Sequence, residues 1–563
     1  MITTDKESCL ILVSLLEAHG VKRAVVSPGS RNAPLLVAME RSGTLETTVV
    51  VDERSAAFVA LGLSTITGEP VAIVCTSGTA LLNYAPAVAE AYYRKIPLIV
   101  ISADRPMEWI DQDDSQTLRQ FEALSHYVKR SYDIPARCGD ENSRWYCNRV
   151  INDALTLAVT GRTGPVHINM QLDEPLGRLA DHKTGRERVI DCVSPRADLS
   201  VCEARSLGDS IASPCRVLVV GGFIAPDEKL NRALVKLSRK PNVTVMCENI
   251  SNLHCDSFID TIDSVLSVMS PHEMEAMRPD IVITFGGAIV SRMIKRYLRE
   301  YAPARHWHVG VTENTIDCFR SLTTRVEMSP GIFFTQLASA MQPHNHPSDY
   351  SSRWTKFRVR ARAAHDAYVA AAPWSDLKAF DAIYRRLPQG WNMQFSNGTP
   401  IRYAQLFSSY KLHRCDCNRG VSGIDGCTST AVGASMGYGG TTLLVTGDMS
   451  AQYDVGALAC RALSPRFKMI VMCNGGGGIF RFIGSTSALP ECERYFAASA
   501  DFPARQLAEA YGFAFFEASD EASLNSCWRA FADESARPAM LAVHTPPQLS
   551  ADILRGYFTR NDK

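Results

Sequence analysis

Short apolar runs alternate with helical stretches along the chain in three successive series. The pattern predicts strands at residues 23–26, 48–51, 71–76, 98–102 and 166–170 in the first series, at 216–220, 243–247, 280–285 and 306–309 in the second, and at 391–395, 442–446, 467–473, 513–516 and 540–544 in the third. Strands that are apolar throughout and alternate with helices are typical of parallel sheets buried on both faces. The sequence therefore predicts three doubly wound α/β domains.

Polar segments separate the three series. Residues 181–200 have the composition of a linker, and Pro, His and Ser gather around residues 342–352. We therefore expect domains at 1–180, 200–342 and 375–563. The second series has glycines at its strand ends, but no complete Gly-Xaa-Gly-Xaa-Xaa-Gly motif follows a strand. A structural role is thus favoured there over nucleotide binding.

Composition excludes several classes of function. Among the 563 residues, Lys plus Arg equals Asp plus Glu at 59 each, so no global charge draws the protein to nucleic acid. Apolar runs fall short of the roughly 20 residues that span a bilayer, so no membrane span is expected. The N-terminus lacks the basic region of a signal peptide, and the 17 cysteines are scattered without a framework. These features predict a cytoplasmic protein with reduced thiols.

The segment from Gly447 to Phe480 carries the most informative motif. Strand 442–446 leads into Gly447 and Asp448, and strand 467–473 leads into Asn474 and four glycines. Because the carboxyl ends of parallel strands share one edge of a sheet, Asp448 and Asn474 can meet at one ion. Their oxygens suit Mg²⁺, and a glycine loop lets backbone approach phosphates closely. An ordinary glycine-rich turn after a core strand is the alternative.

The same spacing resembles the motif of the thiamine-diphosphate-dependent enzymes, since Asn474 follows Asp448 by 26 residues. The resemblance implies thiamine diphosphate and Mg²⁺, or Mn²⁺, as cofactors. It implies that the side chains of Asp448 and Asn474 and the carbonyl of Gly476 bind the metal. Met449 and Cys473 stand where the commonest form of the motif has Gly and a first Asn, but neither position need supply a ligand.

The resemblance also implies two catalytic residues. Glu53, after strand 48–51, would face the aminopyrimidine and exchange a proton with it, and a first-turn helix acid is the alternative. Ile424, between glycines, would be the apolar wedge that bends the cofactor, and a core isoleucine is the alternative. The implied cofactor contacts are Ser27, Pro28, Gly29, Glu53, Thr79, Asn83, Ser422, Gly423, Ile424, Gly447, Asp448, Met449, Ser450, Asn474, Gly476, Gly477, Gly478 and Ile479.

Further segments resemble one branch of these enzymes, the menaquinone-pathway synthases that join 2-oxoglutarate to isochorismate. They are residues 27–34, 52–54, 76–80, 103–106, 418–426 and 475–480, and the likeness is weakest in the middle domain. The resemblance implies a carboligase that decarboxylates 2-oxoglutarate and adds the succinyl fragment to isochorismate. It also implies a homo-oligomer, dimer or tetramer, with active sites at the subunit interface.

Substrates with several carboxylates call for arginines, because a guanidinium binds a carboxylate through two parallel hydrogen bonds. For any one arginine taken alone, a solvated surface ion pair is the favoured interpretation, but five at strand ends or in glycine-rich loops are harder to explain in this way. Gly398 stands where many relatives have Ser, so Thr399 could supply the hydroxyl, and Lys295 or Arg296 could take the place of Arg292. The substrate-binding candidates are Ser30, Arg31, Arg105, Gln116, Arg292, Thr399, Arg402, Arg419, Ile479 and Phe480.

Two other functions are compatible with parts of the pattern. An acetolactate synthase-like enzyme or a 2-oxo acid decarboxylase would act on a smaller donor and would not need five arginines. A noncatalytic nucleotide-binding protein with Rossmann-like domains would not bind thiamine diphosphate in a magnesium-dependent way.

Overall fold

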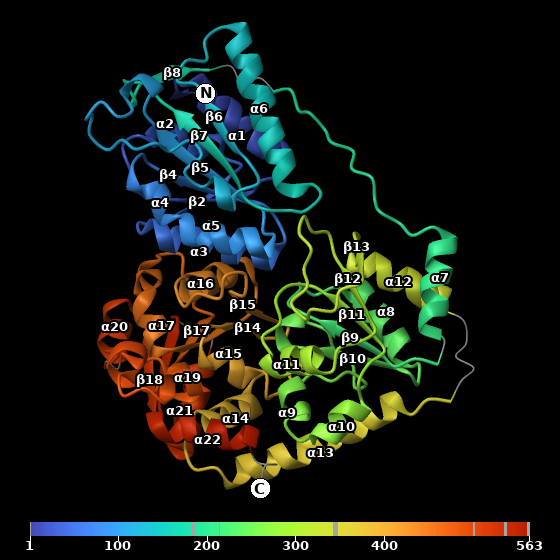
Figure 1. Cartoon of the computed structure of the whole chain (residues 1–563). Coiled ribbons are helices and arrows are strands. Elements are labelled where there is room, and N and C mark those ends of the chain that lie inside the picture. Colours follow the sequence, from blue (N-terminus) through green and yellow to red (C-terminus); the bar gives the residue numbers. More distant parts are fainter. Residues whose placement is uncertain are drawn as a thin grey trace.

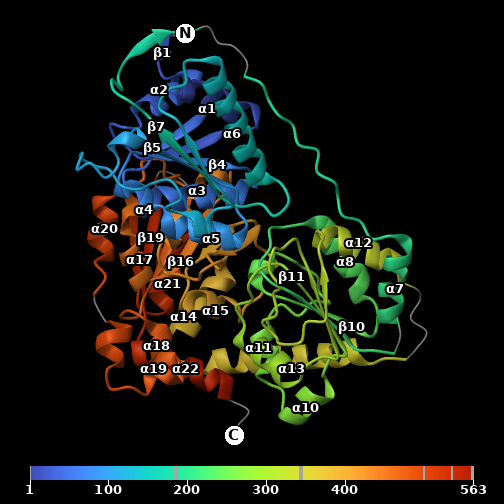
Figure 2. The same ribbon diagram turned by 45° about the horizontal axis from the view of Figure 1, so that its top comes forward.

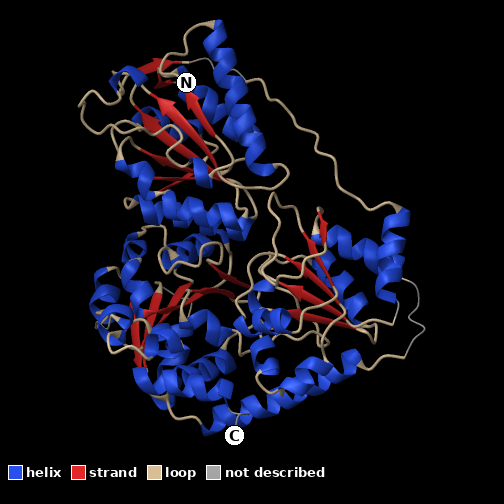
Figure 3. Cartoon of the chain, viewed as in Figure 1, coloured by secondary structure: helices blue, strands red, loops and turns tan. Residues whose placement is uncertain are grey.

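The computed structural model describes residues 2–182, 187–212, 214–341, 347–498, 501–533 and 537–559. Figure 1 shows three α/β units: the N-terminal unit lies above the C-terminal one, and the central unit lies beside them. In Figure 3, helices flank the strands of every unit. All strands pair in parallel within the three large sheets. The predicted α/β class with three parallel sheets is confirmed.

The first sheet has the order β3-β2-β4-β5-β7-β6. Its strands are β2 (Arg23–Val26), β3 (Glu46–Val49), β4 (Val71–Cys75), β5 (Leu98–Asp104), β6 (Ser131–Ile134) and β7 (Val166–Gln171). Its helices are α1 (Glu7–Ala18), α2 (Ala33–Ser42), α3 (Glu53–Thr67), α4 (Thr79–Asn83), α5 (Ala85–Arg94) and α6 (Glu141–Val159). A small antiparallel ribbon of β1 (Ile2–Thr4) and β8 (Leu179–Asp181) joins the two ends of this unit.

The third sheet, β15-β14-β16-β17-β19-β18, repeats the order of the first. Its strands are β14 (Asn392–Phe395), β15 (Arg414–Cys417), β16 (Thr442–Gly447), β17 (Phe467–Cys473), β18 (Ala514–Ala518) and β19 (Ala539–His544). Its helices are α14 (Asp376–Arg386), α15 (Thr399–Ala404), α16 (Cys427–Gly437), α17 (Asp448–Tyr453), α18 (Gly478–Phe482), α19 (Gly484–Ser487), α20 (Ala504–Ala510), α21 (Glu521–Ala532) and α22 (Pro547–Thr559). In such sheets, ligands bind at the carboxyl edge, where the strand order reverses.

The central sheet has the order β10-β9-β11-β12-β13. Its strands are β9 (Val217–Gly221), β10 (Val243–Cys247), β11 (Ile281–Phe285), β12 (Arg305–Val309) and β13 (Thr324–Val326). Its helices are α7 (Val201–Ala212), α8 (Glu228–Ser238), α9 (Ile262–Leu266), α10 (Pro271–Ala276), α11 (Arg292–Glu300) and α12 (Pro330–Ala340). An extended chain, in which residues 187–200 form neither helix nor strand, leads down to α7 from the first unit (Figure 2).

Helix α13 (Tyr350–Ala371) connects the central and third units. Its first half packs through Tyr350 and Trp354 on the core of the central unit, and Val369 near its end packs on the core of the third. The sequence pattern predicted only a Pro-, His- and Ser-rich boundary here. Residue 342, the expected end of the central domain, lies outside the described residues, as do 343–346.

The predicted strands correspond to observed ones, with small shifts. The largest shift places the strand predicted at 48–51 at Glu46–Val49, because Asp52 accepts a hydrogen bond from the amide of Ser55 and starts α3. Strands β1, β6, β8, β13 and β15 were not predicted. Within the described ranges, no helix combines the length and apolarity needed to cross a bilayer.

Helices α3 and α16 join the first and third units through a close crossing. A Cβ on Gly62 would lie 2.0 Å from the carbonyl oxygen of Thr430, and one on Gly433 would lie 1.9 Å from that of Val59. Glycine is thus required on both helices for their backbones to approach. The apolar residues around the crossing belong to one cluster that includes side chains of both sheets.

We expect Gly433→Ala to destabilise this crossing. Alanine normally favours a helix over glycine by up to about 1 kcal/mol, but here its methyl group would overlap α3, at a cost of about 1–3 kcal/mol. The midpoint of thermal unfolding should therefore fall. Gly439→Ala is the control, because its Cβ would meet no atom within 4 Å. A Gly433→Ala protein that melts at or above the wild-type midpoint would contradict this packing.

Candidate active site

Asp448 lies at the carboxyl edge of the third sheet, immediately after β16. Its side chain is buried and accepts hydrogen bonds from the amides of Met449 at 2.7 Å and Gly476 at 3.0 Å. Burial raises the pKa of this carboxyl, although the amides of Gly476 and Met449 oppose the shift. The structure thus brings Asp448 together with the glycine loop after β17, as the sequence indicated. A buried carboxylate with only amide donors is well suited to a cation.

Asn474 supplies a second oxygen from the neighbouring strand end. Its side-chain nitrogen Nδ2 donates to Oδ2 of Asp376 at 2.8 Å. Its oxygen Oδ1 is buried and, among the described residues, has no hydrogen-bond partner. Because buried polar atoms are nearly always satisfied, an unpaired amide oxygen beside a buried carboxylate fits a cation ligand. The residues present therefore fit the divalent metal that the motif implies.

The backbone of the glycine loop has conformations that other residues rarely adopt. Gly475 and Gly476 have φ values of 72° and 98°. A Cβ on Gly478 would lie 3.1 Å from Nδ2 of Asn474. The loop therefore needs these glycines both to turn and to pass close to Asn474.

Arg481 is hydrogen-bonded to the backbone of the glycine loop after β17. The sequence analysis did not identify this residue. Its guanidinium is buried, donates to the carbonyls of Asn474 at 3.0 Å and Gly475 at 2.7 Å, and pairs with Glu493 at 2.8 Å. Two consecutive carbonyls are thus occupied by Arg481. The next carbonyl, that of Gly476, accepts a hydrogen bond from the amide of Gly478 at 2.8 Å.

Residues 418–426 form a second loop at the same edge. Asn397 donates to the carbonyl of Gly423 at 2.7 Å, and Ser450 donates to the carbonyl of Ile424 at 2.7 Å. Ser422 has a positive φ of 69°. The half-buried side chain of Ile424 is therefore carried on a loop whose backbone is tied to the residues that follow β14 and β16.

Glu90 of α5 fixes this second loop from the first unit. Its buried carboxylate accepts hydrogen bonds from the amides of Gly420 at 2.8 Å and Val421 at 2.6 Å. Arg94, one turn later, donates to Oδ1 of Asn418 at 3.1 Å. A small cavity of about 100 Å³ lies beside this contact. Glu90 was not a candidate from sequence, because its partners are backbone amides more than 300 residues away.

The first sheet presents its own group of candidates. A Cβ on Gly29 would lie 2.2 Å from Cβ of Thr76, so the loops after β2 and β4 touch. Ser27 is buried and donates to the carbonyl of Val50 at 3.0 Å. Glu53 is half-buried at the start of α3. The other candidates around these loops are exposed: Pro28, Gly29, Ser30, Thr79, Asn83 and Gln116.

Arg31 and Arg105 lie near each other at this edge. Burial and then the charge of Arg105 lower the pKa of Arg31. Arg31 donates to the carbonyl of Leu172 at 3.0 Å, and Arg105 pairs with Asp114 at 3.0 Å. The Arg105 side chain is only 17% exposed. Two shielded guanidinium groups close together favour an anionic ligand.

A second group of arginines spans the central and third units. Burial and then the charges of Arg292 and Arg419 lower the pKa of Arg402 to about 10, so its guanidinium stays charged near neutral pH. The Nε atoms of Arg402 and Arg419 are buried and, within the described part of the chain, have no hydrogen-bond partner. Arg419 does donate to Oδ1 of Asn397 at 2.9 Å. The group thus has donors to spare for carboxylates.

Two carboxylates, the buried Glu248 and the half-buried Asp263, lie beside this second group. Burial raises the pKa of Glu248 to about 7, although the amides of Val290 and Ser291 and the charge of Arg419 oppose the shift. Burial also raises the pKa of Asp263, which accepts a hydrogen bond from Ser291. Both carboxylates therefore hold the turn that leads into α11.

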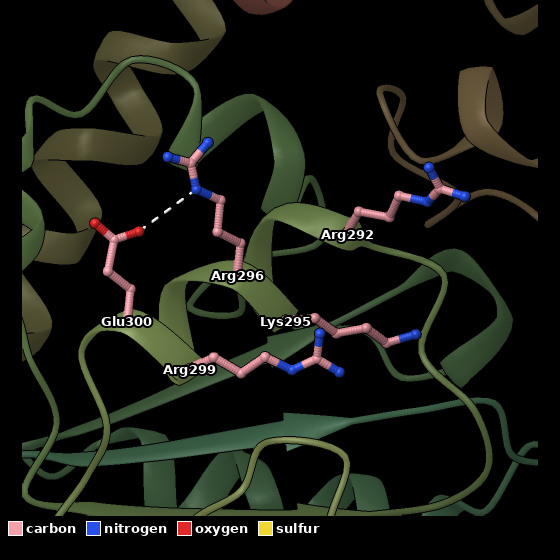
Figure 4. A pocket seen from close by; sticks show the side chains of 5 residues that line it. All are labelled: Arg292, Lys295, Arg296, Arg299 and Glu300. Carbon is pink, nitrogen blue, oxygen red and sulfur yellow. Dashed lines mark hydrogen bonds and ion pairs between the residues drawn. The ribbon is translucent and has the colours of Figure 1, made fainter. Parts of the chain in front are cut away.

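Arg292, Lys295 and Arg296 differ in their surroundings. All three line a cavity of about 580 Å³ with Arg299 and Glu300. Figure 4 shows Arg292 extending away from the other four side chains, whereas Arg296 turns back to Glu300, at 3.4 Å. Lys295 donates to the carbonyl of Ile289 at 2.6 Å. Of the three, Arg292 is the one whose charge acts on Arg402.

The remaining candidates line the same edge of the third sheet. Thr399 is buried at the start of α15, and Ile479 and Phe480 are half-buried in α18. Gly398 has a φ of 98°, which explains why glycine rather than serine stands there. Among the residues that the structure describes, no hydrogen bond or ion pair joins Glu53, Arg31 or Arg105 to Asp448 or Asn474. In one chain the candidates thus form two groups.

Comparisons with known proteins identify the family of the chain. Residues 10–123 match the family described as thiamine pyrophosphate enzyme, N-terminal TPP binding domain. The chain is 41% identical to the 2-succinyl-5-enolpyruvyl-6-hydroxy-3-cyclohexene-1-carboxylate synthase of Porphyromonas gingivalis, over 99% of this chain and 97% of the relative. It is 36% identical to the synthase of the same name from Flavobacterium johnsoniae (97% of both chains), and 35% identical to that of Bacteroides thetaiotaomicron (99% of both).

The chain belongs to the 2-succinyl-5-enolpyruvyl-6-hydroxy-3-cyclohexene-1-carboxylate synthase family. The predicted family and enzyme class, a thiamine-diphosphate-dependent enzyme of menaquinone biosynthesis, are thereby confirmed.

Proposed function

We propose that the protein decarboxylates 2-oxoglutarate and adds the remaining succinyl fragment to isochorismate, with release of CO₂. The observation that carries this proposal is the group of Arg292, Arg402 and Arg419, in which the half-buried Arg402 has the charges of two further guanidinium groups beside it. Such a group is stable only with nearby negative charge. Glu248 and Asp263 supply part of it, and substrate carboxylates would supply the rest.

Mg²⁺, or Mn²⁺ in its place, would be held by Asp448, Asn474 and the carbonyl of Gly476. The buried, unpaired Oδ1 of Asn474 supports this assignment. Gly447, Met449, Ser450, Gly477 and Gly478 would complete the diphosphate site. The metal would neutralise diphosphate charge that the nearby carboxylate of Asp448 would otherwise repel.

Thiamine diphosphate, when bound, supplies the carbon nucleophile that allows a 2-oxo acid to lose CO₂ and its remainder to be transferred. Glu53 would hold and exchange the proton at the aminopyrimidine. Ile424 would press on the cofactor from the loop that Glu90 and Ser450 hold. Ile479 and Phe480 would exclude water from the reacting carbon. The rings of the cofactor would be contacted by Ser27, Pro28, Gly29, Thr79, Asn83, Ser422 and Gly423.

The two arginine groups would divide the substrate carboxylates between them. Arg31 and Arg105, with Ser30 and Gln116, would bind isochorismate. Arg292, Arg402 and Arg419, with Thr399, would bind the other carboxylates. Arg292 is preferred to Lys295 and Arg296, because these two are engaged with Ile289 and Glu300.

We further propose domain boundaries at 1–180, 200–342 and 375–563, with α13 as a connector between the last two. The strands of the three large sheets fall inside these ranges. Cys9, Cys75, Cys147 and Cys247 are buried free thiols, which supports a reducing, cytoplasmic location.

The function can be tested by one assay. The protein is incubated with Mg²⁺, thiamine diphosphate, 2-oxoglutarate and isochorismate, and the products are followed by mass spectrometry. We expect CO₂ and the succinylated cyclohexene product. CO₂ released from pyruvate but not from 2-oxoglutarate would refute the substrate assignment and favour the smaller-donor enzymes.

Arg105→Ala should weaken the use of isochorismate. Loss of a shielded guanidinium that binds a carboxylate costs roughly 2–5 kcal/mol, so kcat/KM for isochorismate should fall more than tenfold. Affinity for thiamine diphosphate should not change. Arg119→Ala is the matched control, because that side chain is 83% exposed and pairs with Asp111 at the surface. If both variants show wild-type kinetics, Arg105 does not bind the acceptor.

We also propose that each active site is shared between two subunits, because in the resembling family the domain that carries Glu53 and the domain that carries Asp448 face each other across a subunit interface. Glu53→Gln and Asp448→Asn should each be nearly inactive. In a mixed dimer, one site would combine the intact Glu53 of one subunit with the intact Asp448 of the other. Random mixing makes half of the dimers mixed, with one good site in two, so about a quarter of wild-type activity should return on co-expression. If mixed dimers form but activity does not return, each site uses Glu53 and Asp448 of the same chain.

A further inference from the structure

The amide of Asn474 has two chemically different ends, and only its oxygen can bind a cation. In the structure, Nδ2 faces Asp376 at 2.8 Å, and the buried Oδ1 is left without a partner among the described residues. An amide that turned by 180° about its last bond would present N–H groups to the metal and lose it. Some feature of the protein must therefore select one orientation.

Asp376 is placed to make this selection. It is the first residue of α14, and its side chain is buried, with the residue only 2% exposed. Its Oδ1 accepts a hydrogen bond from Thr545 at 2.5 Å, and its backbone amide donates to the hydroxyl of Ser550 at 3.0 Å. Thr545 follows β19, and Ser550 belongs to α22. These two contacts, one to the carboxylate and one to the backbone amide, fix the position of Asp376.

A carboxylate only accepts hydrogen bonds, so it pairs with the nitrogen end of the amide and rejects the oxygen end. We propose that Asp376 is a positioning residue that holds Asn474 with its oxygen toward the divalent cation. The proposal rests on the metal ligands Asp448 and Asn474 proposed above. It adds a residue 98 positions away from Asn474 to the metal site.

Two substitutions separate orientation from charge. In Asp376→Leu no acceptor remains, so the Asn474 amide is free to turn. In Asp376→Asn the negative charge is lost, but the new amide oxygen can still accept from Nδ2 while its NH₂ group donates to the Thr545 hydroxyl. We expect the affinity for Mg²⁺ to fall at least tenfold in Asp376→Leu and less than threefold in Asp376→Asn.

The measurement is calorimetric titration of Mg²⁺ into chelator-treated full-length protein with saturating thiamine diphosphate. Thermal unfolding without metal is recorded for each variant, to show that the fold is retained. Asp376→Leu with affinity within threefold of wild type would overturn the proposal. A tenfold or greater loss of Mg²⁺ affinity in Asp376→Asn would also overturn it, because the charge of Asp376 rather than the orientation of Asn474 would then determine affinity. If Asp376→Leu does not fold, the result for Asp376→Asn alone decides between the two.

Asp448→Asn in the same titration separates this proposal from the metal site itself. Unchanged Mg²⁺ affinity in Asp448→Asn would show that the metal lies elsewhere, and both assignments would fail. If Asp448→Asn loses Mg²⁺ while Asp376→Leu keeps it, the metal site stands and only the role of Asp376 is refuted.

Discussion

The contact between Asp448 and the glycine loop after β17 is the interaction on which the active site depends. It exists because β16 and β17 are adjacent parallel strands that end at one edge, with Gly447 paired to Met472. The rest of the edge is arranged around it. Arg481 donates to two carbonyls of the loop, and Asp376 accepts from the amide nitrogen of Asn474. Ser450 donates to the backbone of the second loop, residues 418–426. These contacts fix the two loops and the amide of Asn474, whose Oδ1 has no hydrogen-bond partner among the described residues.

The central unit contributes more to this arrangement than the candidate Arg292 alone suggested. Glu248 follows β10, and its carboxylate holds the backbone of the turn that carries Arg292. Asn252 of the same unit exchanges two hydrogen bonds with the backbone of Cys415, in β15 of the third sheet. The central unit is therefore attached to the third sheet beside Arg402 and Arg419, and it supplies both positive and negative charge there.

The sequence predicted the features that depend on local pattern. Apolar strands and the Asp448–Asn474 spacing were both readable, because strand ends in a parallel sheet must meet. The sequence analysis failed where contacts with other parts of the chain determine the local structure. Strand β15 was not predicted, and it contains the charged residues Arg414 and Asp416, which are buried as an ion pair at 2.6 Å. The sequence analysis missed Asp376, Arg481 and Glu90 for the same reason. Each is hydrogen-bonded to backbone groups or to a side-chain amide, and no sequence motif identifies such partners.

We propose above that the carboxyl edge of the third sheet holds thiamine diphosphate through a divalent cation. Calorimetric titration of thiamine diphosphate into chelator-treated wild-type protein, with and without Mg²⁺, tests it most directly. We expect removal of Mg²⁺ to weaken the affinity for thiamine diphosphate at least tenfold and Mn²⁺ to restore it. An affinity that is equal with and without a divalent cation would contradict a metal-held diphosphate at this edge.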